Sequence, residues 1–165
     1  MPMKVRYTVL DGEVISERRN GVLHDYMVDP LGSTIGLVDS TQSVTDTFAY
    51  SPFGEVVSRT GTTTTPFQYV GSQGYYKDSS SRSYVRARTL NVNLGRWMTQ
   101  DPIGFGGGDW NVYRYVMNNS INQTDPSGNN PIIIIGVAVG LFALSELIGV
   151  GRDCYIAVRL TVDPI

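Results

Sequence analysis

The 165-residue sequence is poor in the residue types that build disulfide frameworks, zinc sites and nucleic-acid surfaces. Its one cysteine, Cys154, cannot form an intrachain disulfide, and its one histidine, His24, leaves no Cys/His cluster. We therefore expect no structural metal. Thirteen Lys and Arg against 15 Asp and Glu give a formal net charge of -2. Nucleic acid is not an expected partner, because a nucleic-acid-binding protein needs an excess of positive charge.

The chain also lacks an N-terminal apolar stretch of signal-peptide length, because Asp11 and Glu13 interrupt the first candidate. We expect no cleavable export signal in this chain, so export from the cytoplasm would depend on specialised machinery. The length suits one ordered body with a modest core, together with an appendage.

Good helix formers are sparse before residue 131, whereas 18 glycines and 10 tyrosines favour short strands and tight turns. In residues 5–22, short apolar pairs are broken by Asp11-Gly12 and Asn20-Gly21, a pattern typical of strands joined by two-residue hairpin turns. Further strands are predicted at 26–28, 35–38, 44–50 and 55–58. The predicted fold is mainly β and is built of antiparallel hairpins.

One turn signature recurs, with Asp or Ser first, proline second and glycine fourth. This order favours a type I turn, because the first side chain accepts a hydrogen bond, proline fixes φ and glycine tolerates a positive φ. The copies are Asp29-Pro30-Leu31-Gly32, Ser51-Pro52-Phe53-Gly54, Asp101-Pro102-Ile103-Gly104 and Asp125-Pro126-Ser127-Gly128. The spacing of the first two suggests a repeating hairpin unit.

Arginines alternate with aromatic residues in the segment that follows residue 69. One interpretation is cross-strand pairing and guanidinium stacking on tyrosine faces in a half-exposed sheet; another is an anion site. The arginines concerned are Arg82, Arg86, Arg88 and Arg96, and the tyrosines are Tyr75, Tyr76 and Tyr84. The glycine run 106–108 has neither P-loop nor dinucleotide-fold spacing, and we expect no cofactor.

Two helices are predicted. Asp109 is placed to cap a short helix over 110–117, whose apolar residues recur at roughly helical spacing and would dock on the sheet. Residues 132–151 carry one charged side chain, Glu146, and are long enough to cross a bilayer as a helix, which takes about 20 residues. A buried helix and an aggregation-prone β segment are the alternatives for this apolar segment.

The order of the motifs resembles the RHS repeat-associated core region, and residues 26–50 resemble the tyrosine/aspartate (YD) repeats that precede that core. The likeness covers residues 25–128. It rests on Tyr50-Ser51-Pro52-Phe53-Gly54, Pro66-Phe67-Gln68-Tyr69, Tyr84-Val85-Arg86-Ala87-Arg88, Leu94-Gly95-Arg96-Trp97, Asp101-Pro102-Ile103-Gly104, Asn111-Val112-Tyr113-Arg114-Tyr115-Val116 and Asp125-Pro126-Ser127-Gly128.

The resemblance implies that the repeats wind into a hollow β-shell, that the core closes one end, and that the polypeptide after the last Asp-Pro turn is a separate cargo, often a toxin. It divides the chain into a β-rich body, 1–128, with the core at about 50–128, and a variable region, 129–165. The implied partners are the rest of an RHS shell, as upstream repeats or another chain, and an immunity protein. The membrane is a further expected partner, through residues 132–151. We expect the protein to be secreted or to lie in the cell envelope.

Some members of the family cleave themselves just beyond the last motif with two aspartates. By motif match these residues would be Asp101 and Asp125, with Arg96 as the nearby positive charge. Two neighbouring carboxylates do not both ionise easily, so one can hold a proton while the other activates water. Three functions follow: a non-catalytic scaffold with a membrane-seeking tail, a self-cleaving aspartyl peptidase, and a surface module that binds carbohydrate or protein. We favour the scaffold, because a turn explains an isolated Asp-Pro equally well.

Overall fold

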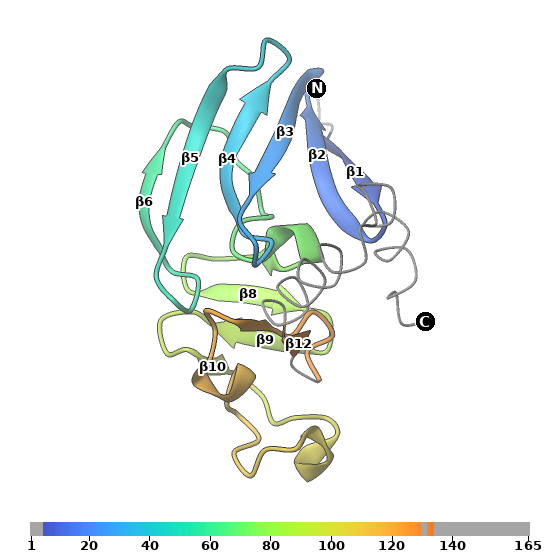
Figure 1. Cartoon of the computed structure of the whole chain (residues 1–165), viewed down its shortest axis with the longest axis vertical. Coiled ribbons are helices and arrows are strands. Elements are labelled where there is room, and N and C mark those ends of the chain that lie inside the picture. Colours follow the sequence, from blue (N-terminus) through green and yellow to red (C-terminus); the bar gives the residue numbers. More distant parts are fainter. Residues whose placement is uncertain (1–4, 130–131, 134–165) are drawn as a thin grey trace, which may run out of the picture.

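The computed structural model describes residues 5–129 and 132–133. Its largest element is a six-stranded antiparallel meander in which each strand pairs with the next one in sequence (Figure 1). The strands are β1 (Val5–Leu10), β2 (Glu13–Arg19), β3 (Val22–Val28), β4 (Thr34–Asp39), β5 (Val44–Tyr50) and β6 (Val56–Thr60). Consecutive pairing confirms the predicted hairpin architecture.

Two tight turns start the meander. Asp11 and Gly12 have φ of 51° and 81°, and Asn20 and Gly21 have φ of 50° and 93°. Positive φ at both central residues is the type I′ geometry, whose twist matches that of the flanking strands. Both predicted two-residue turns are therefore confirmed.

The four Asp/Ser-Pro-x-Gly copies form the same hydrogen-bonded turn. In each, the glycine N–H donates to the carbonyl of the first residue, at 2.9 Å for Gly32 and Gly54, 3.0 Å for Gly104 and 3.1 Å for Gly128. All four glycines have positive φ. The first two copies join β3 to β4 and β5 to β6, so the repeated signature marks the same end of the meander twice.

A second antiparallel sheet lies across that end of the meander in Figure 1. Its strand order is β10-β9-β8-β7, with β7 (Tyr76–Lys77), β8 (Arg82–Val85), β9 (Arg88–Asn91) and β10 (Arg96–Trp97). Two short strands, β11 (Gln123–Thr124) and β12 (Ile132–Ile133), form a separate pair. The remaining elements are 3₁₀ turns: η1 (Gly71–Gln73), η2 (Gly104–Gly107) and η3 (Val116–Asn118).

The hydrophobic core joins the turns at the end of the meander to the second sheet. Leu31, from the first Asp-Pro turn, belongs to the same buried cluster as Leu90 and Trp97, from β9 and β10. Trp97 meets Tyr115 edge to face, with 5.2 Å between ring centroids. Burial raises the pKa of Tyr69 to about 12, so its hydroxyl stays neutral and donates to the Pro52 carbonyl at 3.2 Å. The core therefore locks the two sheets together.

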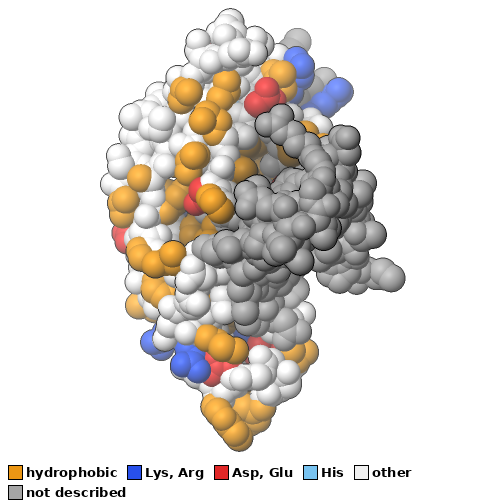
Figure 2. All heavy atoms as spheres, viewed as in Figure 1, with side chains coloured by type: hydrophobic (Ala, Val, Ile, Leu, Met, Phe, Trp, Pro, Cys, Tyr) orange, Lys and Arg blue, Asp and Glu red, His pale blue; other side chains and the backbone are white. Residues whose placement is uncertain are grey.

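The meander surface, in contrast, carries scattered apolar side chains, visible in Figure 2. Val9 on β1 and Val57 on β6 are 58% and 63% exposed. These two strands are also the outer strands of the meander, so each has one side that pairs with no strand among the described residues. Such edges present unpaired backbone N–H and C=O groups to a neighbouring strand.

The helix predicted over 110–117 is wrong. The Asp109 and Asn111 side chains accept hydrogen bonds from the backbone N–H groups two residues further on, and such local turns compete with helix formation. Positive φ at Val116 and Met117 is also incompatible with an α-helix. Trp110, expected to dock on the sheet, is 89% exposed.

The predicted apolar helix over 132–151 lies outside the described residues from position 134 onward. Its first two residues, Ile132 and Ile133, form a strand that pairs with Thr124 and Gln123, so a helix does not begin there. Among the described residues no helix has the length and apolar character needed to cross a membrane.

Candidate functional site

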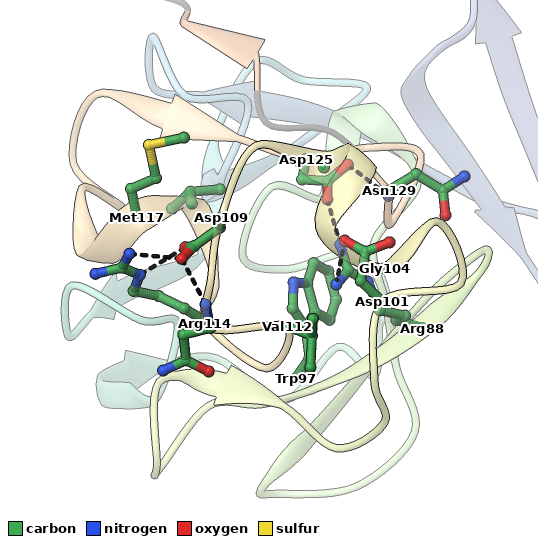
Figure 3. A pocket seen from close by; sticks show the side chains of 13 residues that line it. Arg88, Trp97, Asp101, Gly104, Asp109, Val112, Arg114, Met117, Asp125 and Asn129 are labelled. Carbon is green, nitrogen blue, oxygen red and sulfur yellow. Dashed lines mark hydrogen bonds and ion pairs between the residues drawn. The ribbon is translucent and has the colours of Figure 1, made fainter.

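Arg88, the first residue of β9, binds both of the aspartates that the motifs single out. Its Nη1 lies 2.9 Å from Asp101 Oδ2, and its Nη2 lies 3.1 Å from Asp125 Oδ2. All three side chains are at most 9% exposed. Figure 3 shows the two carboxylates turned toward the one guanidinium. The fold therefore brings the predicted aspartates Asp101 and Asp125 together, on a shared arginine.

The two Asp-Pro turns orient the carboxylates. In the third turn, Asp101 Oδ1 accepts the backbone N–H of Ile103 at 3.0 Å. In the fourth, Asp125 Oδ1 accepts the Ser127 hydroxyl at 2.8 Å and the Asn129 N–H at 3.1 Å. Each aspartate uses one oxygen to hold its own turn and the other to bind Arg88.

The guanidinium also packs on an aromatic ring. Arg88 Cζ lies 4.3 Å from the centroid of Trp97, which is 1% exposed. A cation over an indole face, away from water, is stabilised by about 2 kcal/mol. Because buried charges are tolerated only when they are paired and hydrogen-bonded, Arg88 needs both carboxylates and the ring.

Arg88, Asp101, Asp125 and Trp97 form a group that we call the Arg88 cluster. This cluster also contacts the peptide bond that follows the last turn. Arg88 Nε donates to the carbonyl oxygen of Gly128, and the N–H of Asn129 donates to Asp125 Oδ1. A Cβ at Gly128 would lie 2.6 Å from the Val85 carbonyl oxygen and 3.0 Å from the Arg88 nitrogen, so this position accepts only glycine without a shift. Both sides of the Gly128–Asn129 peptide bond are thus fixed by charged groups.

Arg96, the third residue of the predicted site, lies elsewhere. Its side chain is exposed, and it forms no ion pair with an aspartate among the described residues. The motifs alone do not indicate which of Arg88 and Arg96 is buried. Strand alternation does indicate it, because Arg88 lies two residues from Leu90 and so on the same, buried face of β9. The positive charge beside Asp101 and Asp125 is therefore Arg88.

The four arginines weighed as an anion site do not converge. Arg82 pairs with Asp78, Arg86 donates to the Pro126 carbonyl, and Arg96 lies on a separate surface. Tyr76 and Tyr84 are directly opposite residues of β7 and β8, as the cross-strand interpretation expects. Within the part of the chain that the structure describes, no group of three His, Cys, Asp or Glu side chains is placed to hold a metal ion.

Comparison with known proteins decides the family. The family model described as the teneurin YD-shell matches residues 7–121. The chain belongs to the teneurin YD-shell family. Double-stranded DNA deaminase toxin A of Burkholderia cenocepacia is 31% identical over 126 residues, which span 73% of this chain and 8% of that protein. Toxin subunit YenC2 of Yersinia entomophaga is 31% identical over 123 residues, 71% of this chain and 13% of that protein.

Solved structures show the same fold. The crystal structure of TcdB2-TccC3-Cdc42 matches with a TM-score of 0.69 at 22% identity, over 77% of this chain and 6% of that chain. The resemblance to RHS/YD-repeat toxins is confirmed. This YD-shell chain nevertheless spans a small fraction of each of these relatives.

Proposed function

We propose that residues 5–129 are a non-catalytic structural module that closes one end of a larger YD-repeat shell. The observation that carries this proposal is the second sheet, which lies across one end of the meander and shares its core with the meander turns (Figure 1). At the same time β1 and β6 remain as outer strands. A meander that is covered at one end by a second sheet, and whose outer strands can still pair with further strands, suits the terminal part of a longer sheet.

In this proposal the Arg88 cluster fastens the last turn of the module. It ties β9 to Asp101 and Asp125, so the chain cannot leave the core at residue 128 without exposing a buried charge. The boundary between the body, 1–128, and the variable region, 129–165, would then lie where this cluster ends. The partner is the remainder of an RHS shell, supplied by upstream repeats or by another chain.

A chimera tests the closing role. Residues 5–129 replace the matching segment of YenC2, and the purified particle is imaged by electron microscopy. Closed particles are expected from the chimera, and open-ended ones from YenC2 that lacks the segment. A folded, soluble chimera whose particles stay open would contradict the proposal.

A second candidate function is self-cleavage. The hydrogen bonds to both sides of the Gly128–Asn129 peptide bond favour it. Arg88 Nε polarises the Gly128 carbonyl, as a donor in an oxyanion hole does. Asp125 accepts the Asn129 N–H, and Asp101 binds the same guanidinium. Water would add to the carbonyl carbon, the C–N bond would break, and the Asn129 nitrogen would take a proton, giving a Gly128 carboxylate and a free amine.

A gel of the purified chain tests this candidate beside Asp101→Asn and Asp125→Asn, with Arg96→Gln as the control. If the chain cleaves itself, the wild type and Arg96→Gln should each give a product that ends at residue 128. Neither aspartate variant should give this product. An intact wild-type chain across pH 4–8 removes the candidate.

We further propose that the variable region is a membrane-seeking cargo exported with its shell. Its support is the sequence of 132–151 and the toxin names of the relatives. Expression of residues 129–165 in bacteria is expected to raise membrane permeability, and expression together with 1–128 or with an immunity protein to suppress it. A tail that changes neither growth nor permeability contradicts this part.

A further inference from the structure

A groove of about 450 Å³ lies between β10 and the segment that follows the glycine run. It is distinct from the Arg88 cluster, because none of Arg88, Asp101 and Asp125 lines it. Its volume falls in the range of small-ligand sites, about 300–1,000 Å³. In Figure 2, basic and acidic side chains lie next to one another, beside exposed apolar ones, near the lower end of the molecule.

Two arginines lie side by side along this groove. Arg96 and Arg114 are directly opposite residues of an antiparallel bridge, so their side chains lie on the same face, and both line the groove. Like charges in this arrangement destabilise a sheet. Within the described residues the Arg96 side chain forms no hydrogen bond or ion pair, whereas Arg114 pairs with Asp109, and this pairing offsets the repulsion. Arg96 is therefore an exposed cation that lines the groove and has no partner for its side chain among the described residues.

Arg114 is held in a fixed orientation. Its Nε and Nη2 donate to the two Asp109 oxygens, both at 2.6 Å, and Asp109 Oδ1 also accepts the Asn111 N–H. The hydrogen bond from Arg114 lowers the pKa of Asp109, so the pair stays charged. The bidentate contact uses one edge of the guanidinium and leaves Nη1 for another acceptor.

Amide groups supply further donors. Asn111 Oδ1 accepts the Tyr113 N–H at 3.1 Å, and this contact orients the Asn111 side chain so that its NH₂ group is left to donate. Asn118 also lines the groove, and no Asp or Glu does. The groove therefore presents the unpaired Arg96 guanidinium, the remaining Nη1 of the Asp109-bound Arg114 and two amides, and no carboxylate lines it, so it is complementary to an anion.

The rest of the groove wall is apolar or aromatic. Phe53, Leu94 and Tyr113 line it, and Leu94 is exposed. Gly95 lets the Phe53 ring approach, because a Cβ there would lie 2.8 Å from a ring carbon. The ligand thus needs an anionic group on a body with aromatic or aliphatic surface, which an inorganic ion lacks.

We propose that this groove binds an acidic segment of a polypeptide, with Asp or Glu carboxylates on Arg96 and Arg114 and neighbouring apolar side chains on Phe53, Leu94 and Tyr113. Guanidinium groups match carboxylates in plane and in spacing. The groove offers separated side-chain donors and apolar walls, whereas phosphate is typically cradled by converging backbone N–H groups. This binding is independent of shell closure and of self-cleavage.

Fluorescence anisotropy tests the proposal with the full 165-residue chain. The probe is a labelled octapeptide that alternates Glu and Phe, and its counterpart carries Gln in place of each Glu. The acidic peptide is expected to bind saturably, and the Gln peptide at least about tenfold more weakly, because a hydrogen bond to a charged group contributes about 1.5–3 kcal/mol. Arg96→Gln is expected to weaken binding of the acidic peptide by a similar factor.

Arg6→Gln is the matched control, since Arg6 is an exposed arginine on β1 that does not line the groove. It should leave the affinity for the acidic peptide unchanged, and the Arg96→Gln chain should keep its wild-type unfolding midpoint. Equal affinity for the two peptides overturns the proposal. An Arg6→Gln loss as large as that of Arg96→Gln, or the absence of saturable binding, overturns it too.

Discussion

Arg88 and Asp125 form an ion pair that is almost fully buried, with Nη2 3.1 Å from Oδ2 and side chains 3% and 2% exposed. Asp101, which belongs to a separate turn, binds the same guanidinium. The guanidinium binds one oxygen of each aspartate, and the hydrogen bonds from Ile103, Ser127 and Asn129 hold the other oxygen of each. The cluster therefore forms only when both Asp-Pro turns and β9 have taken their final places.

Replacing Arg88 tests the energetic weight of this cluster. Arg88→Met keeps the side-chain length but leaves two buried carboxylates without their cation, so the free energy of unfolding should fall by about 3–5 kcal/mol. Arg96→Met, at an exposed arginine without an ion pair among the described residues, should change it by less than about 0.5 kcal/mol. Urea unfolding at pH 7 measures both, and equal midpoints for the two variants would refute a structural role for the cluster.

Alanine substitutions at Gly128 and Gly12 distinguish the stability cost of steric crowding from the cost of a positive φ. Both have positive φ, 73° and 81°, but a Cβ at Gly128 would meet three backbone atoms, whereas nothing lies within 4 Å of one at Gly12. Gly12→Ala should cost about 1–2 kcal/mol from the left-handed conformation alone. Gly128→Ala should cost about 1–3 kcal/mol more, because the last turn must shift. Thermal and urea unfolding of the two variants give the comparison, and similar losses would show that residue 128 is not pressed against β8 and β9.

Asp46 links stability to pH. Burial of this carboxyl raises its pKa, but hydrogen bonds from Thr63 and Thr45 and the charge of Arg59 outweigh burial, and the pKa is lowered overall. A carboxyl whose folded pKa is depressed stabilises the fold above its unfolded pKa, about 3.9, and loses that contribution as pH falls through the folded value.

Asp46→Asn should therefore be less stable than the wild type from pH 5 to 7, and the difference should shrink as the pH falls below about 4. Asp25→Asn, at an exposed residue of β3, is the control. Urea midpoints between pH 3 and 7 give the profile. A wild-type advantage that is constant down to pH 3 would contradict the assignment.

The outer edge of β1, which pairs with no strand among the described residues, predicts association between chains. In the absence of upstream repeats, unpaired backbone groups on an outer strand favour pairing with a second copy. Light scattering should show a mass that rises with concentration, and Val9→Lys, on β1, should reduce the rise because charge protects an edge. Ala49→Lys, on the interior strand β5, should have no such effect. A wild-type chain that is monomeric at all concentrations would show that the β1 edge does not pair.

The sequence predicts the parts of this fold that local chemistry decides. Asp11-Gly12 and Asn20-Gly21 specify their turns by backbone conformation, and the Asp/Ser-Pro-x-Gly order specifies four more. The helix over 110–117 was wrongly predicted because apolar spacing was weighed without the side-chain turns of Asp109 and Asn111.

The candidate site was predicted in part. No local rule joins Asp101 to Asp125; family resemblance alone paired them, and the described geometry places both on Arg88. The motif match points to Arg96 as the nearby positive charge, whereas the structure places Arg88 there. The contact that matters is tertiary, between Trp97 and an arginine on the neighbouring strand β9.

Hydrogen exchange of the last turn tests most directly whether the Arg88 cluster fastens the end of the module. In the wild type, the Gly128 and Asn129 amides should exchange as slowly as those of β9, because both are hydrogen-bonded within the buried cluster. In Arg88→Met they should exchange rapidly, while the β2–β5 hairpins keep their protection. Rapid exchange at residues 128 and 129 in the wild type would contradict the proposed role of the cluster.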